Sequence, residues 1–167
     1  MSPEEINYLN DLRSSHPETV ADAIIDLGKQ CGSSHAPSVV PFLTHPSAEV
    51  RAAAIRSLAF YWGLPAYREQ AARMMNEDPD VEVRVVAMMG WSGLAPKQDR
   101  ATLLRLREFL ADRSLPPYLR ANAFDSILSL AEVPFDVHRR HNVPVDATLD
   151  THIDWVWIDK LCGLSRP

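Results

Sequence analysis

The sequence has little cysteine, no long apolar run and no excess of positive charge. Among its 167 residues are two cysteines, Cys31 and Cys162, which lie far apart and match no disulfide or metal-ligand spacing. They are typical of reduced thiols, so we predict a cytoplasmic protein. No stretch approaches the roughly 18 apolar residues of a membrane-spanning helix, so no membrane is expected as a partner. Residues 1–5 are acidic and lack the apolar run of a signal peptide.

Positive charge is not concentrated in any segment. The chain holds 17 Lys and Arg against 22 Asp and Glu, a net charge of −5. Most of this excess falls in residues 1–30, where six carboxylates face two basic side chains. A protein that binds nucleic acid through its phosphates usually carries a Lys/Arg patch. Nucleic acid is therefore not expected as the partner.

Sequence patterns for chemistry are also sparse. There is no Gly-rich phosphate loop and no nucleophile elbow. His138 and His141 have a spacing that suits a metal on a helix, but arginines flank them and no third ligand is near. Cys31 and His35 could form a thiolate beside a base, although a structural thiol next to a turn histidine is far more common. We therefore predict a protein that is not an enzyme, with no catalytic residues, no metal and no cofactor.

Helix signals dominate what is present. Ser2-Pro3-Glu4-Glu5 has the form of an N-cap followed by a capping-box Glu, and it predicts a helix to about Arg13. His16-Pro17 predicts the start of a second helix that ends near Gly32. Strong helix formers continue along most of the chain. The expected fold class is all-α.

A segment of the chain recurs at a nearly fixed period. The ten residues from His45 to Ala54 recur from Asp78 to Ala87, 33 residues later, and their core recurs at 119–123. A fainter copy begins at His16. Each of the three clearer copies follows another apolar segment, and these segments span residues 38–44, 66–76 and 100–111. Repeats of this length predict stacked helical hairpins.

Aligning the three clearer copies gives columns of apolar residues spaced by four, as on one stripe of a helix. The columns are Val50, Val83 and Leu119; Ala54, Ala87 and Ala123; and Leu58, Trp91 and Ile127. Between them lies a column of small residues, Ser57, Gly90 and Ser126. The apolar columns are expected to form the core, and the small residues to let a neighbouring helix approach closely.

The Pro, Val-Arg, Ala and Leu arrangement of these copies resembles the HEAT-repeat superfamily, including the HEAT-like repeats of phycobilin lyases. The resemblance implies an α-solenoid of about four stacked antiparallel helical hairpins over residues 1–133. Such proteins usually carry an Asp before the Pro that builds a ladder with the Arg. Only Asp78 matches, since His45 and Ser114 occupy the comparable positions.

Residues 134–167 lack the repeat and are expected to cap the last hairpin within the same domain. We predict a loop over residues 134–149. Residues 151–161 would be a helix with Ile153, Trp157 and Leu161 on one side, or a strand that places Ile153, Trp155 and Trp157 together.

Three arginines recur at one position of the repeat, namely Arg51, Arg84 and Arg120. They could bind phosphates or acidic side chains, but the resemblance favours a structural role between repeats. HEAT-like DNA glycosylases use Trp, Asp and Arg in a concave groove. The same residue types occur here without the matching motif, at Trp62, Trp91, Asp125, Arg51 and Arg84.

The resemblance implies a protein-binding module, either an adaptor or a bacterial toxin-neutralising immunity protein, that acts as a monomer or weak oligomer. A nucleic-acid-binding protein of the DNA glycosylase type and a phycobilin-lyase-like subunit are the alternatives. The binding surface is expected on the second helices, opposite the apolar columns. Its residues would be Glu49, Arg56, Phe60, Glu82, Met89, Tyr118, Asp125 and Ser129. A mixture of charges with aromatic side chains and Met is typical of interfaces, although a merely solvated face fits equally well.

Overall fold

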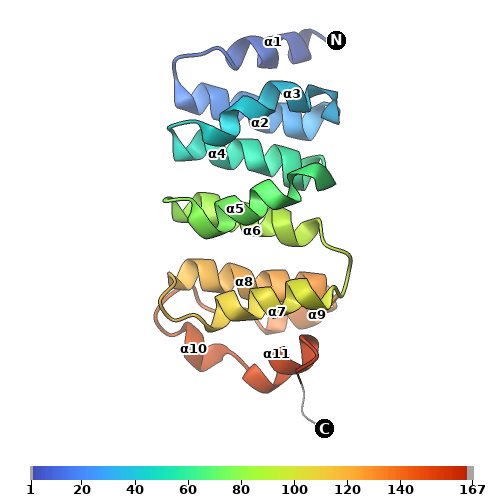
Figure 1. The fold of residues 1–167 in the computed structure, drawn as a ribbon, viewed down its shortest axis with the longest axis vertical. Coiled ribbons are helices and arrows are strands. Elements are labelled where there is room, and N and C mark those ends of the chain that lie inside the picture. The colour runs from blue at the N-terminus through green and yellow to red at the C-terminus, as the bar shows by residue number, and fades with distance from the viewer. Residues whose placement is uncertain (1, 165–167) are drawn as a thin grey trace. The chain divides into compact units, whose positions relative to one another are not determined.

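The computed structural model describes residues 2–164, and within them every regular element is helical, as predicted. The α-helices, drawn in Figure 1, are α1 (Pro3–Asp11), α2 (Pro17–Gln30), α3 (Ala36–Val39), α4 (Ala48–Ile55), α5 (Arg68–Glu77), α6 (Val81–Gly93), α7 (Arg100–Ala111), α8 (Pro117–Leu130), α9 (Phe135–Arg140), α10 (Leu149–His152) and α11 (Trp155–Leu161). Short 3-10 turns at Ser33–His35, Val40–Thr44 and Pro65–Tyr67 and a π-helical turn at Arg56–Tyr61 extend them. Between Ser2 and Leu164, no helix has both the length and the apolar character needed to cross a membrane.

The helix ends follow local chemistry. The Ser2 hydroxyl accepts from the Glu5 amide while the Glu5 carboxylate accepts from the Ser2 amide, so the predicted capping box is present. Proline opens α2 at its first position, as predicted. Asp80 and Asp99 cap α6 and α7 by accepting backbone N–H bonds. These caps satisfy donors that a helix leaves unpaired at its start.

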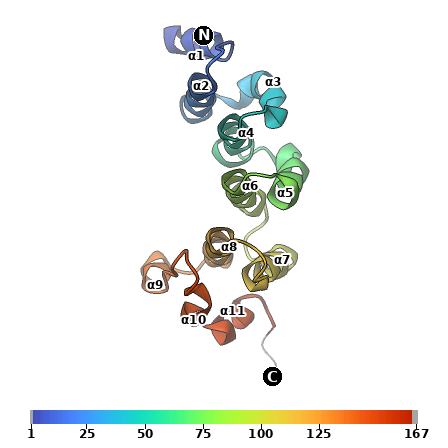
Figure 2. The same ribbon diagram turned by 90° about the vertical axis from the view of Figure 1, so that its left-hand side faces the viewer.

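The chain divides into two compact units, residues 1–94 and 95–167. In the first unit, α2, α4 and α6 lie side by side in one layer, and α3 and α5 lie in a second layer against them (Figure 2). Among the α-helices, the short helix α1 has its main contacts with α2. This unit therefore consists of three helical hairpins, in agreement with the predicted repeat.

The predicted apolar columns form the core of both units. Val50, Ala54 and Leu58 of the second hairpin are fully buried, and so are their counterparts on α6 and α8, with one exception. Trp91 is half-buried, and the guanidinium of Arg68 lies 5.2 Å from the centre of its ring. This is a cation–π contact, which covers one face of the indole.

The column of small residues permits close helix packing, as predicted. A Cβ at Gly90 would lie 2.7 Å from the Cβ of Ala59, which is shorter than any normal contact. Ser57 is fully buried, and its hydroxyl donates to the Ile24 carbonyl at 2.9 Å. The second helices of neighbouring hairpins therefore approach each other through small side chains.

The second unit contains the hairpin of α7 and α8 followed by three short helices. The predicted loop over residues 134–149 is partly wrong, because Phe135–Arg140 form α9. Sequence periodicity could not reveal this helix, since none of its residues is buried. Its ends explain it instead: Pro134 precedes it, Asp136 is in its first turn, and basic side chains occupy its last turn, where they interact favourably with the helix dipole.

The helical alternative for residues 151–161 is confirmed, but the helix is broken. α10 ends at His152, Ile153 is extended, and the Asp154 carboxylate caps α11 by accepting from the Trp157 amide. The break turns Ile153 and Ile158 inward, where both are buried. Leu161 and Trp157 are only half-buried.

Candidate functional site

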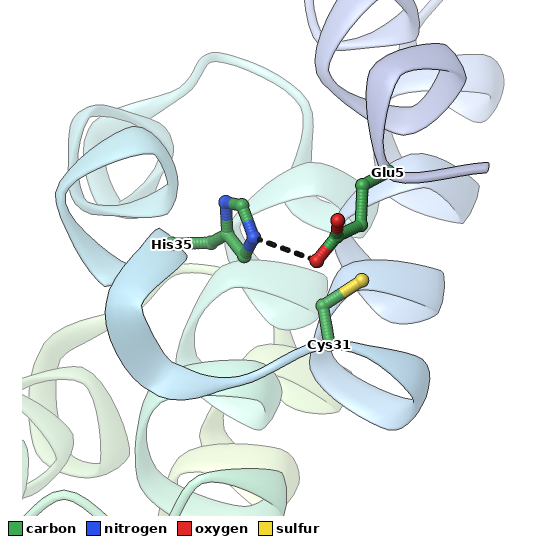
Figure 3. A group of neighbouring side chains, drawn as sticks. All are labelled: Glu5, Cys31 and His35. Atoms are coloured by element: carbon green, nitrogen blue, oxygen red, sulfur yellow. Dashed lines mark hydrogen bonds and ion pairs between the residues drawn. The ribbon is translucent and has the colours of Figure 1, made fainter. Parts of the chain in front are cut away.

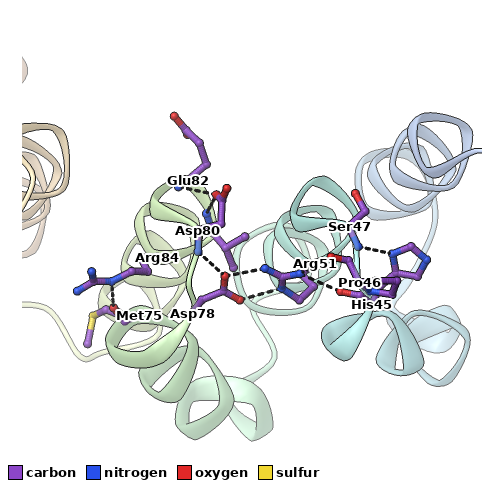
Figure 4. A network of polar contacts seen from close by, with 10 residues as sticks. His45, Pro46, Ser47, Arg51, Met75, Asp78, Asp80, Glu82 and Arg84 are labelled. Atoms are coloured by element: carbon purple, nitrogen blue, oxygen red, sulfur yellow. Dashed lines mark hydrogen bonds and ion pairs between the residues drawn. The ribbon is translucent and has the colours of Figure 1, made fainter.

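The recurring arginines hold the hairpins together. Arg51 forms a two-pronged ion pair with Asp78, with Nε to Oδ2 at 2.8 Å and Nη2 to Oδ1 at 2.7 Å, and its third nitrogen donates to the carbonyls of His45 and Pro46 (Figure 4). Arg84 donates to the carbonyl of Met75 at 3.0 Å. These bonds satisfy carbonyl groups at the ends of the preceding segments and link the second hairpin to the third.

Arg120 has the same role in the second unit, but its acid comes from elsewhere. Its Nε donates to the Leu110 carbonyl at 2.8 Å, and its other nitrogens pair with the carboxylate of Asp150 on α10. Arg113 also lies 3.3 Å from that carboxylate. These contacts support a structural role for the three recurring arginines.

The first unit carries a groove of about 480 Å³ along its second helices. The apolar part of its lining comes from α2, α4 and α6 and includes Ala21, Ile25, Ala48, Ala52, Ala53 and Val86. Around it stand the side chains of Asp22, Glu49, Arg56, Asp80 and Glu82. Three of the residues predicted for the binding surface, Glu49, Arg56 and Glu82, thus line one groove.

A smaller hollow of about 180 Å³ continues from this groove, and the two share Arg56 and Val86. It is lined by the predicted residues Phe60 and Met89 together with Tyr61. Phe60 is 52% exposed and Met89 39% exposed, which is high for side chains of this size and polarity. Exposed apolar side chains beside a groove are typical of binding surfaces.

The π-helical turn at Arg56–Tyr61 shapes this part of the site. Its bonds reach one residue further than α-helical bonds, as in the bond from the Trp62 amide to the Ser57 carbonyl at 3.0 Å. Arg56 and Phe60 both lie in this turn. Such turns are rare and occur often at functional sites. Helical periodicity did not predict this one.

The charge of the larger groove is predominantly negative, with four carboxylates against one guanidinium. Asp80 is partly committed, since its carboxylate caps α6 by accepting from the amides of Glu82 and Val83. Asp22, Glu49 and Glu82 are exposed. Asp22 and Ile25 were not predicted for the binding surface, because α2 carries only the fainter copy of the repeat.

The remaining predicted surface residues, Tyr118, Asp125 and Ser129, lie on α8 in the second unit. Asp125 is exposed but engaged, since its carboxylate is 3.2 Å from His138 Nε2 on α9. The Ser129 carbonyl accepts from the Lys97 ammonium at 3.3 Å. Tyr118 is half-buried. These three residues belong to the second unit, and none of them lines the groove of the first unit.

His138 and His141 have different partners. While His138 faces Asp125, the ring of His141 stacks on Trp157 at 4.3 Å between centroids, and its Nδ1 is 2.9 Å from the Val137 carbonyl. No third ligand-type side chain joins them among residues 2–164. The arrangement gives both rings contacts that position α9 and α11.

At the end of α2, a third side chain joins the pair Cys31 and His35 that the sequence suggested. Cys31, His35 and Glu5 each place one ligand-type atom within 4.8 Å of the others (Figure 3). Burial, together with the charges of Glu5 and Asp26, raises the pKa of the Cys31 thiol. The pKa of Glu5 is lowered by its bonds to the Ser2 amide and to His35. The sequence could not show that Glu5 lies beside Cys31 and His35, because Glu5 belongs to α1.

A family model of HEAT repeats matches residues 7–91. No curated protein and no solved structure matched the chain. The matched residues run from α1 to α6, and they include the Arg51–Asp78 ion pair and the groove of the first unit. Matching just over half of the 167 residues, this model shows that the chain belongs to the HEAT-repeat family.

Proposed function

We propose that this protein is a non-enzymatic protein-binding module and that it binds its partner in the groove along α2, α4 and α6. HEAT repeats generally mediate protein interactions, which fits a hairpin stack whose second helices form a continuous face. The observation that carries the proposal is the groove itself, with an apolar floor, exposed Phe60 and Met89 at one end, and charged side chains around it.

The lining of the larger groove favours binding over catalysis. Its eleven residues include no hydroxyl, thiol or imidazole side chain, so it offers no Ser, Thr, Cys or His nucleophile. Its four carboxylates repel phosphates, which weighs against the DNA glycosylase alternative. The same carboxylates attract Lys and Arg. The partner that fits is a protein segment with basic side chains around an apolar stripe.

Both roles predicted from the resemblance, an adaptor and a toxin-neutralising immunity protein, would use this contact. We further propose that the protein acts in the cytoplasm as a monomer or weak oligomer. Support for the compartment comes from Cys31 and Cys162, which are both free thiols. Light scattering on the purified chain tests the oligomeric state.

The test is a selection of binding peptides from a random library on the full-length protein, followed by affinity measurement. We expect enrichment of peptides that combine Lys or Arg with apolar residues at helical spacing. The double variant Glu49→Lys/Glu82→Lys should bind them at least about tenfold more weakly, because it reverses charge at the groove.

The matched control is Glu69→Lys/Glu77→Lys, which changes the net charge equally but alters two exposed residues of α5, in the other layer. It should retain the affinity of the wild type. Selected peptides that are acidic, or a loss of binding that is equal in the two double variants, would contradict the proposed groove.

A further inference from the structure

Three metal-ligand side chains from three different elements converge at the N-terminal end of the first unit (Figure 3). Glu5 belongs to α1, Cys31 follows the last residue of α2, and His35 ends the 3-10 turn Ser33–His35. His35 Nε2 is 3.4 Å from Glu5 Oε1, and the Cys31 sulfur completes a triangle with sides of at most 4.8 Å. None of these residues lines the groove of the first unit.

We propose that Glu5, Cys31 and His35 form a binding site for one Zn²⁺ ion, with water as the fourth ligand. A thiolate, an imidazole and a carboxylate are the three side-chain ligands that zinc uses most. The combination of sulfur and nitrogen also selects against Mg²⁺ and Ca²⁺, which prefer oxygen ligands.

The spacing fits tetrahedral zinc. Bonds of about 2.0–2.1 Å from zinc to nitrogen and oxygen place those two atoms about 3.3 Å apart, close to the 3.4 Å between His35 Nε2 and Glu5 Oε1. A zinc–sulfur bond of about 2.3 Å requires the sulfur about 3.6 Å from each. The three ligand atoms already lie within 4.8 Å of one another, so the sulfur would have to approach the other two by at most about 1.2 Å.

The ligands are held in place before any ion arrives. The Cys31 amide donates to the Leu27 carbonyl at 3.0 Å, and its carbonyl accepts from the Trp62 indole at 3.0 Å. The second oxygen of Glu5 accepts from the Ser2 amide at 2.6 Å. Outer contacts of this kind orient metal ligands and strengthen binding. The backbone of Cys31 and the carboxylate of Glu5 are therefore already positioned beside the site.

The proposed site is partly sheltered from solvent. The Cys31 thiol would release its proton to solvent as the sulfur–zinc bond forms. The side chains of His35 and Glu5 are only 14% and 25% exposed, so the new charges would be sheltered yet reachable.

The ion would fasten α1 to the rest of the unit. No residue of α1 is fully buried, so apolar packing holds this helix weakly. By coordinating Glu5, Cys31 and His35 together, zinc would link α1 to the end of α2 and to the following turn. Metal binding contributes to folding in this way when the ligands come from separate elements.

The test is titration of the reduced, full-length protein with Co²⁺ as a spectroscopic probe, followed by displacement with Zn²⁺. We expect saturation at about one ion per chain and a thiolate-to-cobalt charge-transfer band in the near ultraviolet. Zn²⁺ at about 100 times its Kd should raise the Tm by about 5 °C.

The variants separate this site from others. Cys31→Ser should abolish the charge-transfer band, and Glu5→Gln, which keeps the capping box, should weaken binding at least about tenfold. Cys162→Ala and His16→Ala should bind as the wild type does. A wild type that binds no more tightly than Cys31→Ser, or a band that survives in Cys31→Ser, would overturn the proposal.

Discussion

Single side chains of the aligned columns carry much of the stability of each hairpin. Leu58 is fully buried among the second helices, where Ala would remove its contacts and leave a cavity. We expect Leu58→Ala to lower the free energy of unfolding by about 2 to 5 kcal/mol. Urea denaturation measures this change. Phe60→Ala, two residues away and exposed, is the control and should change stability by less than about 0.5 kcal/mol.

Gly90 and Gly93 of α6 form a matched pair with opposite surroundings. A Cβ at Gly90 would press on Ala59, whereas a Cβ at Gly93 meets nothing within 4 Å. Gly90→Ala should therefore destabilise the protein by about 1 to 3 kcal/mol through overpacking. Gly93→Ala should be neutral or slightly stabilising, because Ala favours the helix. Equal melting temperatures for the two variants would mean that the helices are not in close contact at Gly90.

At the scale of the elements, ion pairs connect helices and turns that are distant in the sequence. Arg51 and Asp78 link the second and third hairpins, and Arg120 and Asp150 link α8 to α10. Burial raises the pKa of Asp78, but bonds from Arg51 and the Asp80 amide outweigh it, so the pKa lies below the usual value. Bonding from Arg120 likewise lowers the pKa of Asp150. In both cases the charged carboxylate is the form that the fold stabilises.

This pairing predicts a pH dependence of stability. Because the pKa of Asp78 is lower in the folded state, its contribution is complete above the unfolded pKa of about 3.9 and is lost as the pH falls through the folded value. Asp78→Asn should cost about 2 to 3 kcal/mol at pH 7, where charged hydrogen bonds are lost. The difference from the wild type should shrink below about pH 4.

Urea denaturation of both proteins across this pH range measures the effect. Asp22→Asn, an exposed carboxylate of α2, is the control and should change stability little at any pH. A difference between Asp78→Asn and wild type that stays constant from pH 7 to acid would show that the charge of Asp78 contributes nothing.

Across the whole molecule, the segment after α8 covers the end of the second unit. Leu149, Ile153 and Ile158 are buried, and Asp159 pairs with Arg107 of α7 at 2.8 Å. Removing residues 134–167 would expose the apolar surface that these side chains cover and leave Arg120 without its acid. We expect this truncation to aggregate and to melt at a lower temperature.

Size-exclusion chromatography and thermal melting check this prediction. The full-length Val156→Ser variant is the control, since Val156 is 82% exposed and its loss should leave the protein monomeric and equally stable. A truncated chain that stays monomeric with an unchanged melting temperature would contradict the predicted capping role.

The sequence by itself determined the hairpins. Their signals are local: the capping box at Ser2, the proline that opens α2, and apolar residues spaced by four that became the buried columns. Local signals suffice for such a fold, because each hairpin consists of neighbouring segments and repeats itself. The arginine column was visible as well, but not the partner of each arginine.

Only the tertiary structure decided which distant side chains meet. Asp150 reaches Arg120 from thirty residues away, and Glu5 reaches His35 over the same separation. The groove likewise depends on how α2, α4 and α6 pack together. Helical periodicity states which face of a helix is buried. Periodicity does not predict which side chain of another element lies opposite that face. The opposing side chain depends on how the helices pack in three dimensions, and no fixed spacing in the sequence relates two helices that are far apart along the chain.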